Sequence, residues 1–196
     1  PKGLGKVFYL HWPVLFLILV VGSFGFLMLY SVSDGDYDQW SKPQFKRFMV
    51  GFVIMILMGF ISIDFWRTCS PFVYVFGIIL LSLVLFFGDY GGGAKRWLEL
   101  GSFRFQPSEI MKVGLVMFLA IYYDWLKPQN ISKIFWVLIP VLIIALPTAL
   151  VIPQPDLGTG VIIAMTGITM MFAAGVHFIY FFIIILFIPA FLALIF

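Results

Sequence analysis

The chemically richest part of the chain is residues 91–112, GGGAKRWLELGSFRFQPSEIMK, which lies between long and almost wholly apolar stretches. It begins with three glycines, which give the backbone the freedom to turn sharply. Beyond them, charged residues alternate with apolar and aromatic ones: Lys95, Arg96, Glu99 and Arg104 with Trp97, Leu98, Leu100, Phe103 and Phe105. A segment of this composition suits a membrane interface.

Lys95, Arg96 and Trp97 are adjacent in this segment and could cradle a phosphate or pyrophosphate at the membrane surface. The guanidinium of Arg96 is a planar fork that fits phosphate oxygens, and Trp97 would anchor at the level of the lipid headgroups. Ordinary interfacial anchoring by a basic and aromatic cluster explains the same residues, so both interpretations stay open.

A helix is expected to start at Gln106-Pro107-Ser108-Glu109, with Ser108 as the capping residue and Glu109 in the first turn. Lys112 follows Glu109 by three residues, so the two side chains share one helix face and can form an ion pair. A single charge costs about 2.5 to 3.5 kcal/mol at the centre of a bilayer, so the pair is expected to face a polar cavity. It could equally be a structural ion pair that pins the helix.

A second group of polar residues is the segment 153–159, PQPDLGT. Two prolines stiffen its entry and Gly158 permits a close turn, so Asp156 should be held at a defined place near a helix N-terminus. Its carboxylate could cap that helix, bind a cation or accept a proton, and Thr159 is a competing cap.

Other polar residues are weaker candidates. The acidic loop with Asp34, Asp36 and Asp38 lacks the later bidentate glutamate of a calcium loop and is expected to be solvated. His11 and His177 stand alone at the edges of apolar stretches. The sequence contains no zinc pattern, phosphate-binding P-loop or nucleophile elbow.

Composition places the chain in a membrane. Of its 196 residues, 63% are hydrophobic and 11% are charged, which is far too apolar for a water-soluble domain. The formal charge of +3 comes from cations near the predicted membrane edges, where lipid phosphate is the natural counter-ion, so nucleic acid is not an expected partner. The single cysteine, Cys69, permits no internal disulfide and is expected to be buried and inert.

Seven stretches are long and apolar enough to cross a bilayer as helices. They are residues 12–30, 48–63, 72–87, 110–123, 134–152, 161–174 and 178–194. The fourth and sixth are short, which suggests helices that begin inside a protein-lined cavity, and Pro140, Pro147 and Pro189 should kink their spans. The predicted fold is an all-α, polytopic membrane bundle that forms one domain over residues 1–196.

Charge between the spans favours a cytoplasmic N-terminus once the cations of residues 95–112 are set aside as a functional site. The inner side then carries five cations and the outer side three: Lys2, Lys6, Arg67, Lys127 and Lys133 against Lys42, Lys46 and Arg47. This orientation brings the loops 88–109 and 153–159 together as an outer polar site. The chain reaches Phe196 within an apolar stretch, so we expect it to be a fragment of a longer protein.

The motif GAKRWLELGSFRFQPSE, followed further along the chain by QPDLGT, closely resembles the SEDS family (shape, elongation, division and sporulation) of bacterial membrane proteins that polymerise peptidoglycan. Gln154 before PDLGT is similar to the RodA-like, cell-elongation branch, whereas the FtsW division branch usually has glutamate there. The resemblance covers nearly the whole chain, whose seven spans match the first seven of the family's ten.

The resemblance implies a peptidoglycan glycosyltransferase that polymerises lipid II on the outer face of the cytoplasmic (inner) membrane. Trp97 is similar to a tryptophan that the family needs for activity, Arg96 and Lys112 become candidate partners of the pyrophosphate beside Lys95, and Glu109 and Asp156 line or order the same cavity. A divalent cation, Mg²⁺ or Mn²⁺, could assist. The implied partners are a class B penicillin-binding protein, which is a transpeptidase, and other membrane proteins of the elongation complex.

The resemblance also places the presumed catalytic aspartate in an outer loop after the seventh span, beyond Phe196. Residues 1–196 alone are therefore expected to be inactive. Two alternatives remain. A lipid II flippase or transporter would also need a polar cavity with intramembrane charge, although no inverted repeat is apparent. A scaffold that positions a partner enzyme is the other.

Overall fold

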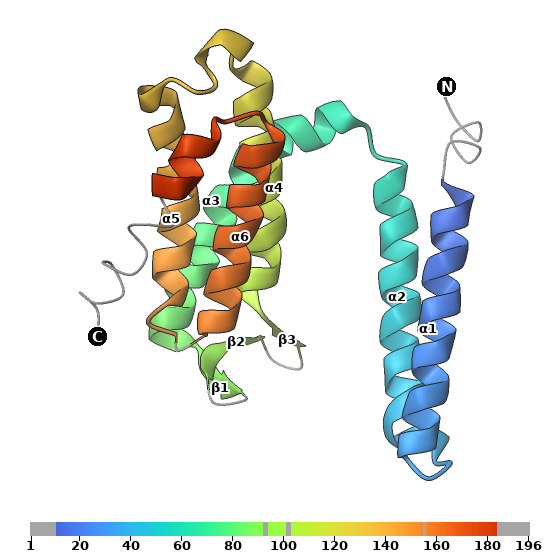
Figure 1. Ribbon diagram of the computed structural model, residues 1–196. Coiled ribbons are helices and arrows are strands. Elements are labelled where there is room, and N and C mark those ends of the chain that lie inside the picture. Colours follow the sequence, from blue (N-terminus) through green and yellow to red (C-terminus); the bar gives the residue numbers. More distant parts are fainter. Residues whose placement is uncertain (1–10, 92–93, 101–102, 155, 184–196) are drawn as a thin grey trace. The chain divides into compact units, whose positions relative to one another are not determined.

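The computed structural model describes residues 11–91, 94–100, 103–154 and 156–183, and the chain there is a set of apolar helices with one small sheet (Figure 1). The helices are α1 (Trp12–Val32), α2 (Lys42–Gly59), α3 (Ile63–Phe87), α4 (Pro107–Trp125), α5 (Ile134–Val151) and α6 (Leu157–Ala173). Residues 178–183 are also helical. The predicted all-α polytopic fold class is confirmed; of the seventh predicted span, the part beyond residue 183 lies outside the described residues.

The chain divides into two compact units, residues 1–65 and 66–196, and the division falls in the first turn of α3. The prediction of one domain over the whole chain stays a prediction. In the first unit, α1 and α2 are joined by a short loop and a π-helical turn, η2 (Tyr37–Ser41). Asp34 and Gly35 turn the chain there, with φ of 51° and 87°. Asp34, Asp36 and Asp38 are exposed, as predicted for a solvated loop.

Three described helices are long and apolar enough to cross a membrane: α1, α3 and α5. The apolar helix α6 has 17 residues. The helices α2 and α4 have the length of a span but include three charged residues each, Lys42, Lys46 and Arg47 in α2 and Glu109, Lys112 and Asp124 in α4. These charges lie in the first two turns of the two helices or, for Asp124, in the last turn of α4, where they can reach the lipid headgroups.

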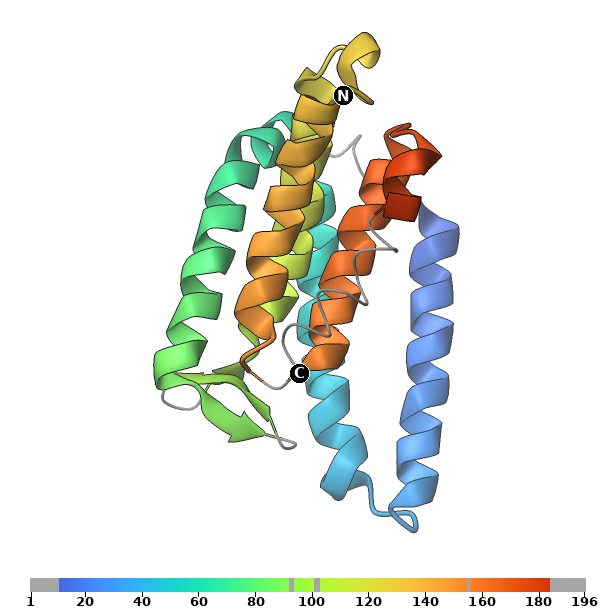
Figure 2. The same ribbon diagram turned by 60° about the vertical axis from the view of Figure 1, so that its left-hand side comes forward.

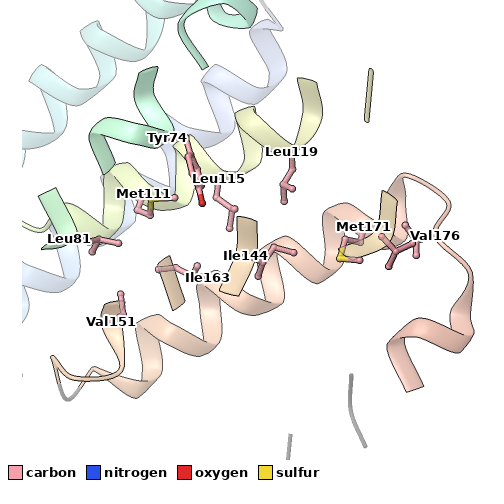
Figure 3. Close-up of a cluster of buried hydrophobic side chains, with 11 residues drawn as sticks. Tyr74, Leu81, Met111, Leu115, Leu119, Ile144, Val151, Ile163, Met171 and Val176 are labelled. Carbon is pink, nitrogen blue, oxygen red and sulfur yellow. The ribbon is translucent and has the colours of Figure 1, made fainter. Parts of the chain in front are cut away.

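The second unit is a bundle of α3 to α6 around one apolar core. Figure 3 shows side chains from all four helices meeting in this core. Met111, Leu115 and Leu119 recur along one face of α4 at helical spacing and are fully buried, as is Ile163 of α6. These helices are apolar on nearly every side, so hydrophobicity alone does not determine which side faces the core. Close packing against the neighbouring helices determines it. Gly114 marks this side, because a Cβ there would lie 3.2 Å from the carbonyl oxygen of Val73.

Two prolines interrupt the hydrogen bonding of α5, and tyrosines from neighbouring helices compensate for both. Pro147 has no N–H to donate to the carbonyl of Ile143, and the hydroxyl of Tyr74 in α3 donates to that oxygen at 2.8 Å. Pro140 likewise leaves the carbonyl of Trp136 without its usual donor, and the hydroxyl of Tyr122 in α4 donates to it at 2.7 Å. Each proline therefore ties α5 to another helix.

The helices α2, α3, α4 and α6 begin earlier than their apolar stretches predicted, whereas α1 and α5 begin at the predicted residues. The second predicted span, 48–63, corresponds to α2 at Lys42–Gly59, and the third, 72–87, to α3, which runs through Pro71 from Ile63. The prediction of a short fourth span is wrong, because α4 starts at Pro107 and has 19 residues. The sixth span starts earlier than predicted, at Leu157, but with 17 residues α6 is still a short apolar helix, as predicted. Proline in a first turn costs no helical hydrogen bond, and a capping residue extends a helix into polar sequence. Cys69 was predicted to be buried, but it is only half-buried.

The loop predicted at residues 88–109 is a small antiparallel sheet followed by the start of α4. Its strands are β1 (Asp89–Gly91), β2 (Ala94–Leu100) and β3 (Phe103–Phe105), in the order β1-β2-β3. Figures 1 and 2 both show it at the end of the bundle where α3 ends and α4 begins. Leu98 of β2 packs against Leu80 and Val84 of α3, so the sheet is attached to the bundle by an apolar contact.

Candidate functional site

Asp156 is the central residue of the polar site. It caps α6, since its Oδ1 accepts from the backbone N–H of Thr159 at 3.3 Å and its Oδ2 from the Thr159 hydroxyl at 2.8 Å. The prediction that Asp156 could be the cap is confirmed, and Thr159 helps by donating to it. The side chain of Asp156 is 8% exposed. A carboxylate so deeply buried requires further donors.

Those donors come from two segments that are distant in the sequence. The Nη1 atom of Arg96 in β2 lies 3.4 Å from Oδ2 of Asp156, and Nε2 of Gln106 donates to the same oxygen at 3.4 Å. Gln106 is the residue that precedes the first turn of α4. The loops 88–109 and 153–159, predicted to share one polar site, thus meet at this carboxylate.

The electrostatics of Asp156 favour the ionised form. Burial alone would raise the pKa of this carboxyl, but the hydrogen bonds from Thr159 and the hydrogen bond and charge of Arg96 outweigh burial, so the pKa lies below its ordinary value of 3.8. At neutral pH, Asp156 is therefore an anion paired with a cation. It is a poor general base in this state, because its proton affinity is low.

Glu109 and Lys112 form the second ion pair, as their spacing on α4 predicted. The Nζ atom of Lys112 lies 2.8 Å from Oε2 of Glu109 and donates to Oε1 at 2.9 Å. The Glu109 side chain is 59% exposed and that of Lys112 27% exposed. The pair is accessible, so it can exchange its internal contact for a ligand at a small cost.

The two ion pairs lie at the same end of the bundle. Gln106, which contacts Asp156, accepts at its carbonyl a hydrogen bond of 3.1 Å from the backbone N–H of Glu109. One helical turn of α4 thus separates the Asp156 cluster from the Glu109–Lys112 pair. Each described contact of Lys112 is with Glu109 and none is with Asp156, so the structure brings Arg96 together with Asp156 and leaves Lys112 in a neighbouring pair.

The strand geometry separates residues that the sequence places side by side. Successive side chains of a regular strand point to opposite faces, so Trp97 in β2 lies on the face opposite to Leu98. At Arg96 the pairing with β1 is irregular, because Asp89 pairs with Trp97 and Tyr90 with Lys95, which leaves Arg96 as an extra residue of β2. Leu98 is buried against the bundle, whereas Trp97 is half-buried. The backbone of Lys95 belongs to β2, but its side chain lies outside the described residues.

Two donors in this region are buried and have no hydrogen-bond partner among the described residues. One is Nε of Arg96, and the other is the hydroxyl of Ser108. Ser108 was predicted to cap α4, and this prediction is wrong: the helix starts at Pro107, so Ser108 lies inside its first turn and the residue before the helix is Gln106. An unsatisfied cationic donor such as Nε of Arg96 retains the capacity to bind an anion or a water molecule.

Sequence reasoning missed the structural roles of Gln106 and Gln154. Gln106 was recognised only as part of a helix start, and Gln154 only as a mark of resemblance. An amide near a proline-rich turn, two residues from a buried acid, is a signal that could have singled out Gln154. Among the described residues, no group of three or more His, Cys, Asp or Glu side chains could hold a metal ion.

Comparison with known proteins identifies the family. The sequence profile of the FtsW/RodA/SpoVE family, described as "Cell cycle protein", matches residues 11–196. The chain is 33% identical over 168 residues to the peptidoglycan glycosyltransferase MrdB of Escherichia coli K12, covering 85% of this chain and 44% of that protein. It is 36% identical over 197 residues to the probable peptidoglycan glycosyltransferase FtsW of Thiomicrospira cyclica, covering 94% of this chain and 49% of that protein.

Solved structures of similar proteins agree with the sequence matches. The rod shape determining protein RodA of Thermus thermophilus is similar with a TM-score of 0.78 and 26% identity, covering 88% of this chain and 56% of that one. A chain of a peptidoglycan synthase complex that coordinates polymerization and crosslinking has a TM-score of 0.80 and 27% identity, covering 93% of this chain and 52% of that one. The chain thus spans about half the length of the relatives that it matches. It is a multi-pass bacterial membrane protein, and it belongs to the FtsW/RodA/SpoVE family.

Proposed function

We propose that the full-length protein is a peptidoglycan glycosyltransferase that polymerises lipid II into glycan strands during cell elongation and so maintains cell shape. The observation that carries the proposal is the convergence of three segments on one buried carboxylate, that of Asp156, which holds Arg96 at the end of the bundle. The named activities of the relatives MrdB and FtsW support the reaction class. The segment QPDLGT supports the elongation branch.

The reaction joins two lipid-linked sugars. A hydroxyl of one substrate loses its proton as its oxygen attacks the anomeric carbon of the other, and the bond from that carbon to the pyrophosphate breaks. The leaving pyrophosphate gains negative charge, which cations stabilise. We assign this role to Arg96 and Lys112, with Lys95 beside them, because these are the cations at or beside the two ion pairs. The general base lies outside residues 1–196 in this proposal.

The remaining site residues order these cations. Asp156 holds the guanidinium of Arg96 through its ionised carboxylate, and Glu109 holds Lys112 until a diphosphate competes for it. Trp97, on the face of β2 opposite to Leu98, would contact the lipid headgroup region or the substrate's sugars. If a divalent cation, Mg²⁺ or Mn²⁺, takes part, the exposed carboxylate of Glu109 would hold it, and it would neutralise charge on the pyrophosphate.

We place the site on the outer face of the cytoplasmic membrane, with the N-terminus cytoplasmic. Within the second unit, the ends of the helices alternate as this orientation requires. The loops around Arg96 and Asp156 share one end. At the other end, Arg67 pairs with Asp124, and the Ser132 hydroxyl accepts from the backbone N–H of His177 at 3.0 Å.

The proposed partners are lipid II and a class B penicillin-binding protein. The structural neighbour from a peptidoglycan synthase complex, which coordinates polymerization and crosslinking, supports a transpeptidase partner. Exposed apolar side chains along α1 and α3, such as Phe24 and Phe72, offer surface for lipid or for other membrane proteins of the elongation complex.

The test uses the purified full-length protein and fluorescent lipid II, with glycan strands separated on a gel. Arg96→Ala is expected to lower the polymerisation rate by about a hundredfold, because a positioned charge is removed from the leaving group. Arg67→Ala is the matched control, since Arg67 also pairs with an aspartate but at the opposite end of the bundle, and it should keep the wild-type rate. Polymer formation by Arg96→Ala at the rate of the control would refute the role of Arg96.

The same preparations separate the alternatives. A flippase would move lipid II across vesicle membranes without forming polymer, and wild-type protein with that behaviour would replace the present proposal. A scaffold would lose its transpeptidase partner when Arg96 or Trp97 is substituted. We expect Arg96→Ala to bind the partner as tightly as wild type in a pull-down assay.

A further inference from the structure

Gln154 is a buried amide in the loop that precedes Asp156. The residue is 3% exposed. Its Nε2 atom donates to the carbonyl oxygen of Leu150 in α5 at 2.9 Å and to that of Leu81 in α3 at 3.2 Å. Leu81 is itself almost fully buried, and it lies 73 residues away in the sequence. One side chain thus joins the loop to two helices.

In this chain an uncharged amide makes both contacts. Carbonyl oxygens only accept hydrogen bonds, so the atom that contacts both must carry two hydrogens, and a primary amide supplies them without charge. An ionised carboxylate at the same place would supply no donor, and a protonated one would supply a single O–H. Methionine has a similar length but neither donor.

Residue 156 follows Gln154 by two positions, and the loop between α5 and α6 has only five residues, 152–156. The place of the Asp156 carboxylate therefore depends on how the loop is held. On the other side, Asp156 holds Arg96 and accepts from Gln106. A displaced loop would move all of these contacts together.

We propose that Gln154 is a positioning residue of the polar site: its two donated hydrogen bonds fix the loop to α3 and α5, and so set where Asp156 presents Arg96 to the substrate. This inference rests on the proposed function, because its effect on activity passes through Arg96. The residue itself touches no reacting atom.

The charges around Gln154 make a pH test possible. The helices α5 and α6 contain no titratable side chain, and residues 75–87 of α3 contain none either. Among the described side chains, the ionisable groups closest to it along the contacts are Asp156 and Arg96, with Glu109 and Lys112 one turn along α4. A glutamate at position 154 would be buried beside the anion Asp156, and both effects disfavour its ionisation.

The experiment compares Gln154→Glu, Gln154→Met and Gln129→Glu in the full-length protein. Gln129 is exposed in the short helix η3 (Pro128–Asn130) and controls for the chemical change itself. Lipid II polymerisation and the melting temperature of the purified protein are measured between about pH 5.5 and 8.5, a range in which a buried glutamate titrates. Each activity is divided by that of wild type at the same pH.

We expect Gln154→Glu to be most active at the acid end, where its protonated carboxyl still donates one hydrogen bond. Its relative activity should fall about tenfold or more towards the alkaline end, because a small displacement of positioning groups lowers turnover strongly. Its melting temperature should fall with its activity. The relative activity of Gln154→Met should be low at every pH because its kcat is lowered. The activity and melting temperature of Gln129→Glu should match those of wild type.

The inference is overturned if the relative activity and the melting temperature of Gln154→Glu do not change with pH. It is also overturned if Gln154→Met has the activity of wild type. If Gln154→Glu yields no folded protein at any pH, the activity of Gln154→Met alone decides. Failure of wild type to polymerise lipid II overturns the proposed function instead. In that case the pH-dependent melting temperature still tests whether Gln154 holds the loop.

Discussion

At the scale of single residues, the carboxylate of Asp156 serves two structures at once. It caps α6 through Thr159, and it neutralises Arg96 from the sheet. Neither contact alone would offset the free-energy cost of burying a charge, since each hydrogen bond contributes only modestly. Together they keep an anion in place at neutral pH and leave Nε of Arg96 without a protein partner among the described residues.

The lowered pKa of Asp156 predicts how stability depends on pH. The ionised carboxylate stabilises the folded state above the ordinary pKa of 3.8, and this contribution is lost as the pH falls through the lower pKa of the folded protein. Asp156→Asn should therefore lower stability by about 1–3 kcal/mol at neutral pH. The difference in melting temperature from wild type should stay constant between about pH 5 and 8 and shrink below about pH 4. A difference that widens towards acid pH would contradict this assignment.

At the scale of helices, each proline of α5 is matched by a tyrosine from a neighbouring helix. A proline in a helix frees the carbonyl four residues before it, and inside a bilayer no water replaces the lost donor. Tyr74 and Tyr122 provide the donors from α3 and α4. Both carbonyls therefore have donors, and each of the two hydrogen bonds ties α5 to a neighbouring helix.

Tyr74→Phe is expected to destabilise the protein by about 1–3 kcal/mol, because the Ile143 carbonyl loses its donor. The same substitution should cost less in a Pro147→Ala background, in which the restored N–H of residue 147 can donate to that carbonyl. Thermal unfolding of the two single variants and the double variant measures the coupling. Tyr37→Phe, at an exposed tyrosine, serves as the control. Equal costs of Tyr74→Phe in both backgrounds would show that the two residues act independently.

The helices α3 and α4 approach each other closely at Gly114, so we expect a larger side chain there to destabilise the protein. A Cβ at position 114 would lie 3.2–3.3 Å from backbone atoms of Val73 and Tyr74, which cannot move without shifting α3. Gly114→Ala should destabilise by about 1–3 kcal/mol, less the gain in helix propensity. Gly51→Ala in α2, where nothing lies within 4 Å, should be neutral or stabilising. The two melting temperatures, compared with wild type, check the contrast.

At the scale of the whole molecule, the contacts at the two ends of the second unit define a topology. Arg96 and Asp156 share one end, and Ser132 and His177 share the other. Each helix of the bundle thus runs from one end to the other. A cytoplasmic N-terminus then places the polar site outside the cell.

Labelling of single cysteines in intact cells tests this orientation. In the full-length protein with Cys69 replaced by alanine, Pro153→Cys should react with a membrane-impermeant maleimide added from outside, and Lys127→Cys should not, because both positions are exposed but lie at opposite ends. Permeabilised cells, in which both cysteines should react, control for accessibility. The reverse pattern would invert the topology.

The sequence by itself determined the membrane location, the helical class and the approximate place of the six α-helices, because length and hydrophobicity decide what can cross a bilayer. It also predicted the Glu109–Lys112 pair and offered capping as one of three roles for Asp156, since pairs and caps depend on neighbours within a helical turn. The small sheet, the true starts of α4 and α6 and the placement of Ser108 were not predicted. Strand pairing depends on partners across a turn, and helix starts depend on caps.

Only the tertiary structure decided which distant residues meet. Arg96 and Asp156 lie 60 positions apart in the chain, and nothing in their spacing predicts a distance of 3.4 Å. The roles of Gln154, Tyr74 and Tyr122 likewise depend on carbonyl groups of other helices. Local patterns reveal what each helix needs, whereas packing determines which neighbour supplies it, because contacts between helices join positions that sequence spacing does not relate.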